Sequence, residues 1–503
     1  MAIDDDTDNA ITSQELENLL KKREDDKEKI RKKKGDKNFT DEYLTKSFIE
    51  QQESSIRFTQ SLGKQWNIWC GTHWLEDQTQ AVRDLVRDHN REIADRIPDG
   101  TTTQKAVLSI RSSNAVLSLS STERSLAMNA EDWDKDPWLL ATPTGTIDLQ
   151  TGLIRGGYQN DYITKITSVG VGSEICCPLW LSTLRQIFPD DPEKINFLQR
   201  WFGYCLTGVT REEKFLFMNG TGRNGKGTIL SIVQWIMGSY SNSLLSEVLM
   251  RVSFGATKDT DLSNLRAARM VVTSEIAEGS KWNLQRLKDV TGGDRLLSRK
   301  LYENLTPFTP THKLIVQGNN LPKLGHVDPA ISNRVILLTF KESFGDNPNV
   351  RLKDDLKLEG AGILAWMLEG CRMWVRNGLA VPKSIADDTD EYLKTMSDLA
   401  LWLDANCLFE NDQMKSRFYT TKELFENYCA WRKETGEGVF ITNADFTNRL
   451  KTHGRGIKVQ ETKKHGLRYV EGIMIKPVFD NSDDSYEHTT KQTSMENGNF
   501  RGF

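Results

Sequence analysis

Residues 214–230 read KFLFMNGTGRNGKGTIL, and this stretch decides the fold of the central part of the chain. An apolar run typical of a buried strand leads into a glycine-rich turn, which is followed by Lys226 and an apolar helical pattern. The spacing of Gly220, Gly225 and Lys226 fits the Walker A pattern, in which backbone N–H groups at a helix N-terminus surround a polyphosphate. The stretch therefore predicts a nucleoside triphosphate site.

ATP and Mg²⁺ are the expected ligands of this site. The position after the lysine usually holds Ser or Thr, which binds magnesium, but this chain has Gly227 there. Thr228 can serve instead if the helix starts slightly differently, so Thr228 and Glu275 are the expected metal ligands. The predicted nucleotide-binding residues are Gly220, Thr221, Gly222, Arg223, Asn224, Gly225, Lys226, Gly227 and Thr228.

Apolar strand candidates alternate with helical patterns between about residues 209 and 345, which predicts a largely parallel sheet. The candidates are residues 214–218, 268–274, 313–317 and 335–340.

Polar residues lie next to three of these strands. Glu275 follows RMVVTS, and its carboxylate can polarise the attacking water or hold the metal, although it can also be an ordinary exposed residue. Glu278 lies nearby and can share that role. Asn319 follows KLIVQG and can bind the γ-phosphate, but Asn in a turn before Pro is also a common structural device. Arg334 precedes VILLTF and can stabilise charge in a neighbour's site or form a surface salt bridge. The candidate catalytic residues are Lys226, Glu275, Asn319 and Arg334.

Length and composition indicate several packed domains and no membrane span. The chain has 503 residues with 66 Lys and Arg against 70 Asp and Glu, a net charge of −4, so any basic surface must be local. Its seven cysteines form no CxxC pair, which argues against a zinc ribbon or a disulfide framework and favours the cytoplasm of a bacterial or other host cell.

The chain is expected to be a multi-domain α/β protein. The predicted divisions are a charged flexible arm, a helical N-terminal domain, a region before the ATPase core, the ATPase core itself, a linker helix, a winged-helix-like domain and a disordered tail. Their expected ranges are 1–38, 39–135, 136–208, 209–382, 383–410, 411–477 and 478–503.

The winged-helix interpretation depends on two predicted helices and a basic strand pair near the C-terminus. Such a unit can place a helix in the major groove of DNA, although a basic protein-contact module is an open alternative. The expected DNA-binding residues here are Arg449, Lys451, Lys463 and Lys464.

Five motifs in order resemble the superfamily 3 helicases, and more narrowly the phage, plasmid and poxvirus type of primase-helicase. They are GTGRNGKGT, VVTSEIAEG, LKDVTGGDRLLSRKLYE, KLIVQGNNLP and DPAISNR. The resemblance covers roughly residues 130–480. The chain differs from the family's pattern at Gly227 and at Ser274, where many relatives have a second acid before Glu275, and both positions bear on magnesium coordination.

The resemblance implies an AAA+-like core, a ring that is usually a hexamer, and ATP-dependent unwinding of DNA with 3′→5′ movement. By position it makes Lys226 the Walker A lysine, Glu275 the Walker B acid, Asn319 the sensor and Arg334 the arginine finger. It also implies a channel hairpin at about residues 298–308, with Arg299, Lys300 and Tyr302 as DNA contacts, although structural packing of that hairpin is an open alternative.

The expected partners are single-stranded and forked DNA, further copies of the chain, and a separate primase or polymerase. The primase expectation arises because no Asp-x-Asp strand with a histidine is evident in residues 1–140. An ATP-controlled replication initiator that does not unwind DNA is the main alternative. A nucleotide kinase or GTPase is a weaker one, since it would leave Arg334 unexplained.

Overall fold

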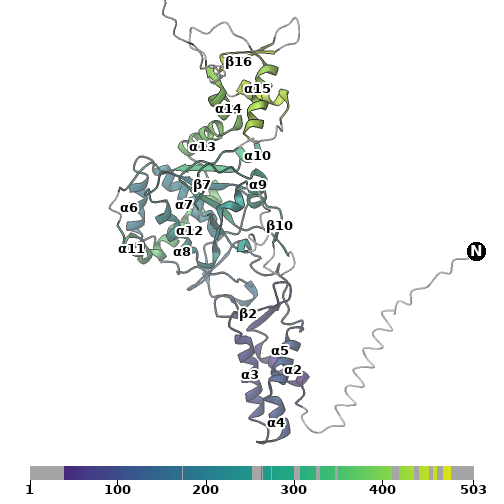
Figure 1. Cartoon of the computed structure of the whole chain (residues 1–503). Coiled ribbons are helices and arrows are strands. Elements are labelled where there is room, and N and C mark those ends of the chain that lie inside the picture. The colour runs from purple at the N-terminus through teal and green to yellow at the C-terminus, as the bar shows by residue number, and fades with distance from the viewer. Residues whose placement is uncertain are drawn as a thin grey trace, which may run out of the picture.

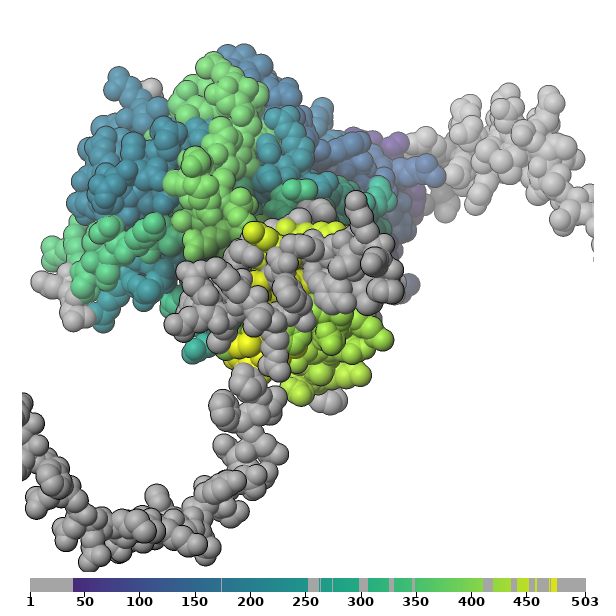
Figure 2. Space-filling model, turned by 90° about the horizontal axis from the view of Figure 1, so that it is seen from above, coloured from purple at the N-terminus to yellow at the C-terminus, as the bar shows by residue number. Residues whose placement is uncertain are grey.

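The computed structural model describes residues 39–476 apart from 173, 252–261, 263, 274, 299–305, 325–328, 346–348, 410–418, 436–440, 453–456 and 462–467. Figure 1 shows an N-terminal unit and a C-terminal unit at opposite ends of a central core. Figure 2 looks from above, with the C-terminal unit in front of the core.

A five-stranded parallel sheet forms the centre of the core. Its strands are β7 (Phe215–Asn219), β8 (Ser241–Leu244), β9 (Met270–Thr273), β12 (Lys313–Gly318) and β13 (Val335–Thr339), and they lie in the order β13-β7-β12-β9-β8. Every neighbouring pair is parallel. The predicted parallel sheet is confirmed, but the polar strand β8 was not predicted because SNSL lacks the apolar run that marks its neighbours.

The apolar run of β7 is buried because both faces of the sheet are covered. Leu216 and Met218 point into one hydrophobic cluster, whereas Phe215 and Phe217 point into another, as the alternation of a strand requires. The first cluster includes side chains of α6 (Pro178–Ile187), α7 (Pro192–Leu206), α8 (Lys226–Met237) and α12 (Gly360–Asn377). The second includes side chains of η3 (Ser246–Leu249), α9 (Leu284–Thr291), α10 (Pro329–Ser332) and α13 (Lys383–Thr395).

Two buried cations join the sheet to the C-terminal end of α7. Arg269 donates to the carbonyl oxygens of Leu206 (2.5 Å) and Leu139 (2.6 Å). Lys313 donates to the carbonyl oxygen of Thr207 and, at 3.3 Å, to that of Val209. Positive charge is favourable at a helix C-terminus, where carbonyl groups lack intrahelical partners, so these side chains fix α7 against the amino ends of β9 and β12.

The N-terminal unit is not entirely helical, and this corrects the expectation for residues 39–135. Its helices are α2 (Asp41–Gln52), α3 (Ala81–Ala94), α4 (Thr102–Val107) and α5 (Ile110–Ser120). They accompany an antiparallel sheet of β1 (Ile56–Thr59), β2 (Gln65–Trp69) and β3 (Trp74–Glu76). Trp66 and Trp69 lie in β2, where QWNIW is rich in strand-forming residues.

Shorter elements complete the core. The strands β4 (Leu139–Thr142), β5 (Gly145–Asp148) and β6 (Ile154–Arg155) form an antiparallel sheet. A short helix, α11 (Leu352–Leu358), precedes α12. Two 3₁₀ turns are η1 (Gln159–Asp161) and η2 (Gly238–Tyr240), and β10 (Leu296–Ser298) pairs with β11 (Thr306–Phe308).

The segment expected as one linker helix divides between two units. Tyr392 of α13 packs in the core, whereas Trp402 of α14 (Asp398–Asn406) packs in the C-terminal unit, so residues 383–410 are not a single linker. The C-terminal unit adds α15 (Thr421–Glu434), α16 (Asn443–Thr452) and the strand pairs of β14 (Cys407–Phe409), β15 (Tyr419–Thr420), β16 (Lys458–Glu461), β17 (Arg468–Glu471) and β18 (Ile473–Ile475). Within the described residues, every helix is too short or too polar to span a lipid bilayer.

Candidate nucleotide-binding site

The glycine-rich turn lies between β7 and α8, as the sequence predicts. Gly222 (φ 95°) and Gly225 (φ 89°) adopt backbone conformations that favour glycine. A Cβ atom on Gly225 would lie 2.4 Å from the Ile187 side chain, so this position also lacks room for a larger residue. Lys226 is the first residue of α8, which directs the N-terminus of the helix toward the turn.

Lys226 is held at the carboxyl edge of the sheet. Its Nζ donates to the carbonyl oxygen of Gly220 at 2.6 Å and to Oδ1 of Asn319 at 3.3 Å. Burial lowers the pKa of Lys226, while the charge of Glu275 acts to raise it. Residues far apart in the sequence meet here because β7, β12 and β9 are adjacent and parallel, which brings their carboxyl ends to one edge.

Asn224 adds an unsatisfied donor beside the turn. The side chain is 2% exposed, and its Nδ2 atom has no hydrogen-bond partner. A buried amide donor without a partner is costly, and an oxygen of a bound phosphate would satisfy it. This orphaned donor fits an anionic ligand in the turn.

The residue at which α8 begins decides whether the Thr228 hydroxyl can reach a bound magnesium ion. Because α8 begins at Lys226, Thr228 is rotated by about 200° from Lys226 around the helix axis. The shift of the helix start on which the Thr228 prediction depended is therefore not observed. Glu275 remains an exposed carboxylate next to the site, and Mg²⁺ commonly binds one carboxylate together with substrate phosphates.

A Gly227→Ser substitution is expected to be tolerated and to tighten magnesium-dependent nucleotide binding about 3- to 10-fold, since the new hydroxyl would occupy the usual ligand position. A Cβ atom at Gly227 meets nothing within 4 Å. Titration of nucleotide with and without Mg²⁺ measures the effect. Gly227→Ala is the matched control, and an equal gain in that variant would exclude a role for the hydroxyl.

Arg334 lies at the amino ends of the strands, whereas the glycine-rich turn lies at their carboxyl ends. It precedes β13, and its backbone oxygen accepts from Phe215 N at the start of β7. The length of β7 separates this edge from Asn219 by about 13 Å. The guanidinium donates to Glu213 Oε2 at 2.7 Å and to the Ala330 carbonyl oxygen at 2.9 Å. Arg334 is therefore not part of the site formed by its own chain.

The expected DNA contacts are only partly visible. Arg299, Lys300, Tyr302, Lys463 and Lys464 lie outside the described residues. Lys451 is exposed on α16, whereas Arg449 is half-buried, and burial lowers its pKa. The basic helix α16 therefore offers Lys451 as its more accessible cation.

The sequence did not identify the segment after β13 as part of the site. Phe344 N donates to the Arg223 carbonyl oxygen at 3.0 Å, and Phe340 N donates to the Asn219 oxygen at 2.8 Å. These two backbone hydrogen bonds attach the turn and the end of β7 to the segment that follows β13. They leave no signal in the sequence, since any residue other than proline can donate through its backbone.

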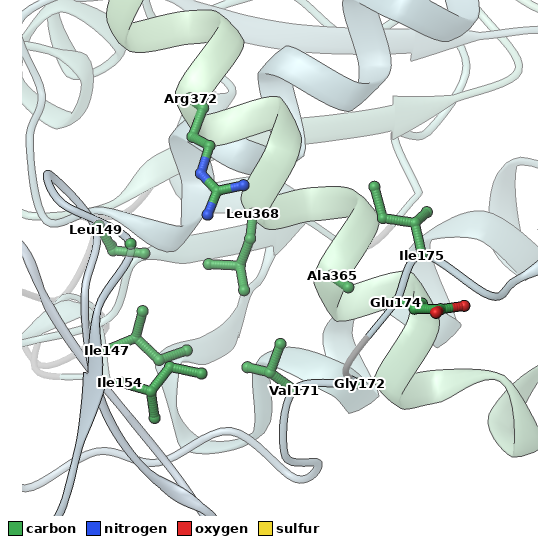
Figure 3. A pocket seen from close by; sticks show the side chains of 11 residues that line it. Ile147, Leu149, Ile154, Val171, Gly172, Glu174, Ile175, Ala365, Leu368 and Arg372 are labelled. Atoms are coloured by element: carbon green, nitrogen blue, oxygen red, sulfur yellow. The ribbon is translucent and has the colours of Figure 1, made fainter.

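A separate cavity of about 280 Å³ lies between the β5–β6 hairpin and α12 (Figure 3). Apolar side chains such as Ile147 and Leu368 line it, and Arg372 projects from α12 at one end. None of the residues predicted to bind nucleotide lines this cavity, so it is distinct from the glycine-rich turn.

Comparison with known proteins gives two family matches, each to a part of the chain. Residues 36–189 match a family described as "D5 N terminal like". Residues 218–334, which include the turn, match a family of unknown function, DUF5906.

The curated relatives that the chain resembles carry helicase names. It is 23% identical over 344 residues to "Putative helicase L207/L206" of Acanthamoeba polyphaga mimivirus, covering 63% of this chain and 35% of that protein. It is 28% identical over 226 residues to "Putative helicase 121R" of Invertebrate iridescent virus 3, covering 42% and 23%. The chain thus spans about a third or less of the length of these relatives. The solved "NrS-1 C terminal region" is 13% identical, with 87% and 100% coverage and a TM-score of 0.46.

Proposed function

We propose that the chain is an ATP-driven DNA helicase of the superfamily 3 type, working as a ring in the replication of a phage, virus or other mobile element. The observation that carries the proposal is the meeting of Lys226, Asn319 and Glu275 at one edge of a parallel sheet. The similarity to helicase-named proteins of DNA viruses supports the assignment to DNA rather than to a small-molecule substrate.

Each residue has a distinct role in this proposal. The turn and Lys226 bind the β- and γ-phosphates of ATP through N–H groups and a positive charge. Asn319 orients the γ-phosphate, and Glu275 accepts a proton from the attacking water or holds it through a hydrogen bond. Glu275 would also hold Mg²⁺, which neutralises charge on the phosphate oxygens when bound.

Arg334 explains why the proposed motor needs more than one copy. Its edge of the sheet lies away from its own turn, so it can reach a γ-phosphate only in a neighbouring copy. A ring meets this condition at every interface, because a heterologous contact repeats around a closed rotation. Six copies and 3′→5′ movement are the expectation from the family.

Glu275→Gln is expected to slow ATP hydrolysis at least about 100-fold while nucleotide still binds, because the amide keeps the shape but cannot accept a proton. Steady-state hydrolysis and binding of a fluorescent nucleotide measure the two properties. Glu278→Gln is the matched control, since Glu278 is another exposed carboxylate in the same loop. If the control reproduces the loss and Glu275→Gln does not, the catalytic carboxylate is Glu278.

Displacement of a labelled strand from forked DNA tests the function itself. The helicase assignment predicts displacement that requires ATP and is abolished by Lys226→Ala. Reversing the single-stranded tail tests the direction, and a 3′ tail is expected to be required. ATP-dependent assembly on DNA without strand displacement would support an initiator instead.

A further inference from the structure

Three short segments of the layer that covers the second face of the sheet lie side by side. Each segment carries one cation. These cations are Arg251, Lys281 and Lys323, and we call the three residues the cationic ledge. Lys281 forms a parallel bridge with Lys323. Arg251 N donates to the Lys281 carbonyl oxygen at 2.8 Å. The three segments follow β8, β9 and β12, so neighbouring strands each supply one cation.

Each segment turns an apolar residue inward beside its cation. Trp282, next to Lys281, is 1% exposed, and its ring packs against Phe215 and Phe217 of β7. Met250 and Pro322, the neighbours of Arg251 and Lys323, are also buried. Successive residues of an extended chain point to opposite sides, which directs the cations outward. The ledge is therefore built on the core and is not a chance grouping of flexible loops.

The C-terminal unit lies close to the ledge, since the charge of Arg432 acts on Lys281. Burial, together with the charges of Lys323, Arg432 and Arg251, lowers the pKa of Lys281 to about 8. Arg432 of α15 forms a buried ion pair with Asp398 of α14. Arg251 and Lys323 are exposed, and neither has an ion-pair partner among the described residues. Such a concentration of positive charge attracts a polyanion.

We propose that the cationic ledge binds phosphates of single-stranded DNA on the side of the core next to the C-terminal unit. The proposal rests on the proposed function, which supplies DNA as the ligand. The β10–β11 hairpin lies at a different place, where Arg295 pairs with Glu131 of the N-terminal unit at 3.4 Å. DNA held at the ledge would thus be bound at the opposite end of the core from the N-terminal unit (Figure 1).

The test compares an Arg251→Ser/Lys323→Ser variant with a matched Lys46→Ser/Lys383→Ser variant. Lys46 and Lys383 are 72% and 91% exposed and lie outside the ledge. Fluorescence anisotropy with a labelled oligothymidylate is measured at several salt concentrations. The ledge variant should bind about tenfold more weakly, with a salt slope smaller by about 1.4, since each phosphate contact contributes about 0.7 on a single strand. Unchanged affinity and slope, or an equal loss in the control, would overturn the proposal.

Two further measurements separate the ledge from the proposed function. ATP hydrolysis without DNA should proceed at the same rate in the wild-type chain and in the ledge variant. If the wild-type chain does not hydrolyse ATP, the proposed function is contradicted, but DNA binding at the ledge is not. Acetylation of lysines in the wild-type chain, with and without oligothymidylate, should show protection of Lys323 but not of Lys383. Equal reactivity of Lys323 in both states would overturn the ledge as a DNA site and favour an acidic protein as its partner.

Discussion

Lys226→Ala is expected to reduce ATP hydrolysis by at least about 100-fold, because the γ-phosphate would lose its matched charge in the transition state. The lysine is 5% exposed and bridges the Gly220 carbonyl oxygen and Asn319, so its removal also separates the turn from the end of β12. Steady-state hydrolysis measures the loss. Nucleotide binding should weaken as well, since the lysine contacts phosphate before and during the reaction.

A charge-conserving control separates chemistry from folding. Lys226→Arg keeps the charge but places it on a larger planar group, so hydrolysis should also fall. The circular dichroism spectra of both variants, without nucleotide, should match that of the wild type, which would show that the lost hydrolysis does not come from unfolding. Hydrolysis at the wild-type rate in Lys226→Ala would exclude the turn as the catalytic site.

Arg334→Ala is expected to abolish hydrolysis while nucleotide binding stays largely intact, with a loss of about 10³-fold or more for an arginine finger. The arginine acts on charge that develops in a neighbour's site, so the ground state does not depend on it. Hydrolysis and nucleotide titration on the same preparation measure both properties.

The Glu213 ion pair offers an internal control for Arg334. If the arginine only stabilises its own subunit, Glu213→Gln should reproduce the defect, since it removes the negative charge from the same 2.7 Å ion pair. The proposed role predicts near-normal hydrolysis in Glu213→Gln. Mixing Arg334→Ala with Lys226→Ala should restore partial activity, because mixed rings contain interfaces with an intact turn and an intact arginine. No recovery on mixing would argue against the role in a neighbouring site.

The sequence predicted the parallel sheet because its central strands carry long apolar runs and polar residues cluster at their ends. FLFM and LIV are buried on both faces, and only such strands produce an uninterrupted signal. The secondary structure of the N-terminal unit was harder to predict, because QWNIW can be assigned to a helix or a strand when only its apolar content is considered. Tertiary packing against α2, α3 and α5 decided the outcome.

The candidate site was predictable in part. Lys226 and Asn319 are separated by 93 positions, yet their strands could be expected to end at one edge because both precede polar turns. The unsatisfied amide of Asn224 and the backbone contacts of Phe344 could not be predicted, since they depend on burial and on main-chain geometry. The cationic ledge was missed for the same reason, because its three cations are dispersed in the sequence.

Sedimentation of the full chain with a labelled non-hydrolysable ATP analogue, Mg²⁺ and single-stranded DNA measures whether nucleotide binding and assembly occur together. Nucleotide and protein are expected to sediment together as an assembly of several copies, because the turn of one copy needs the Arg334 of a neighbour. A chain that remains monomeric and carries no nucleotide under these conditions would contradict it.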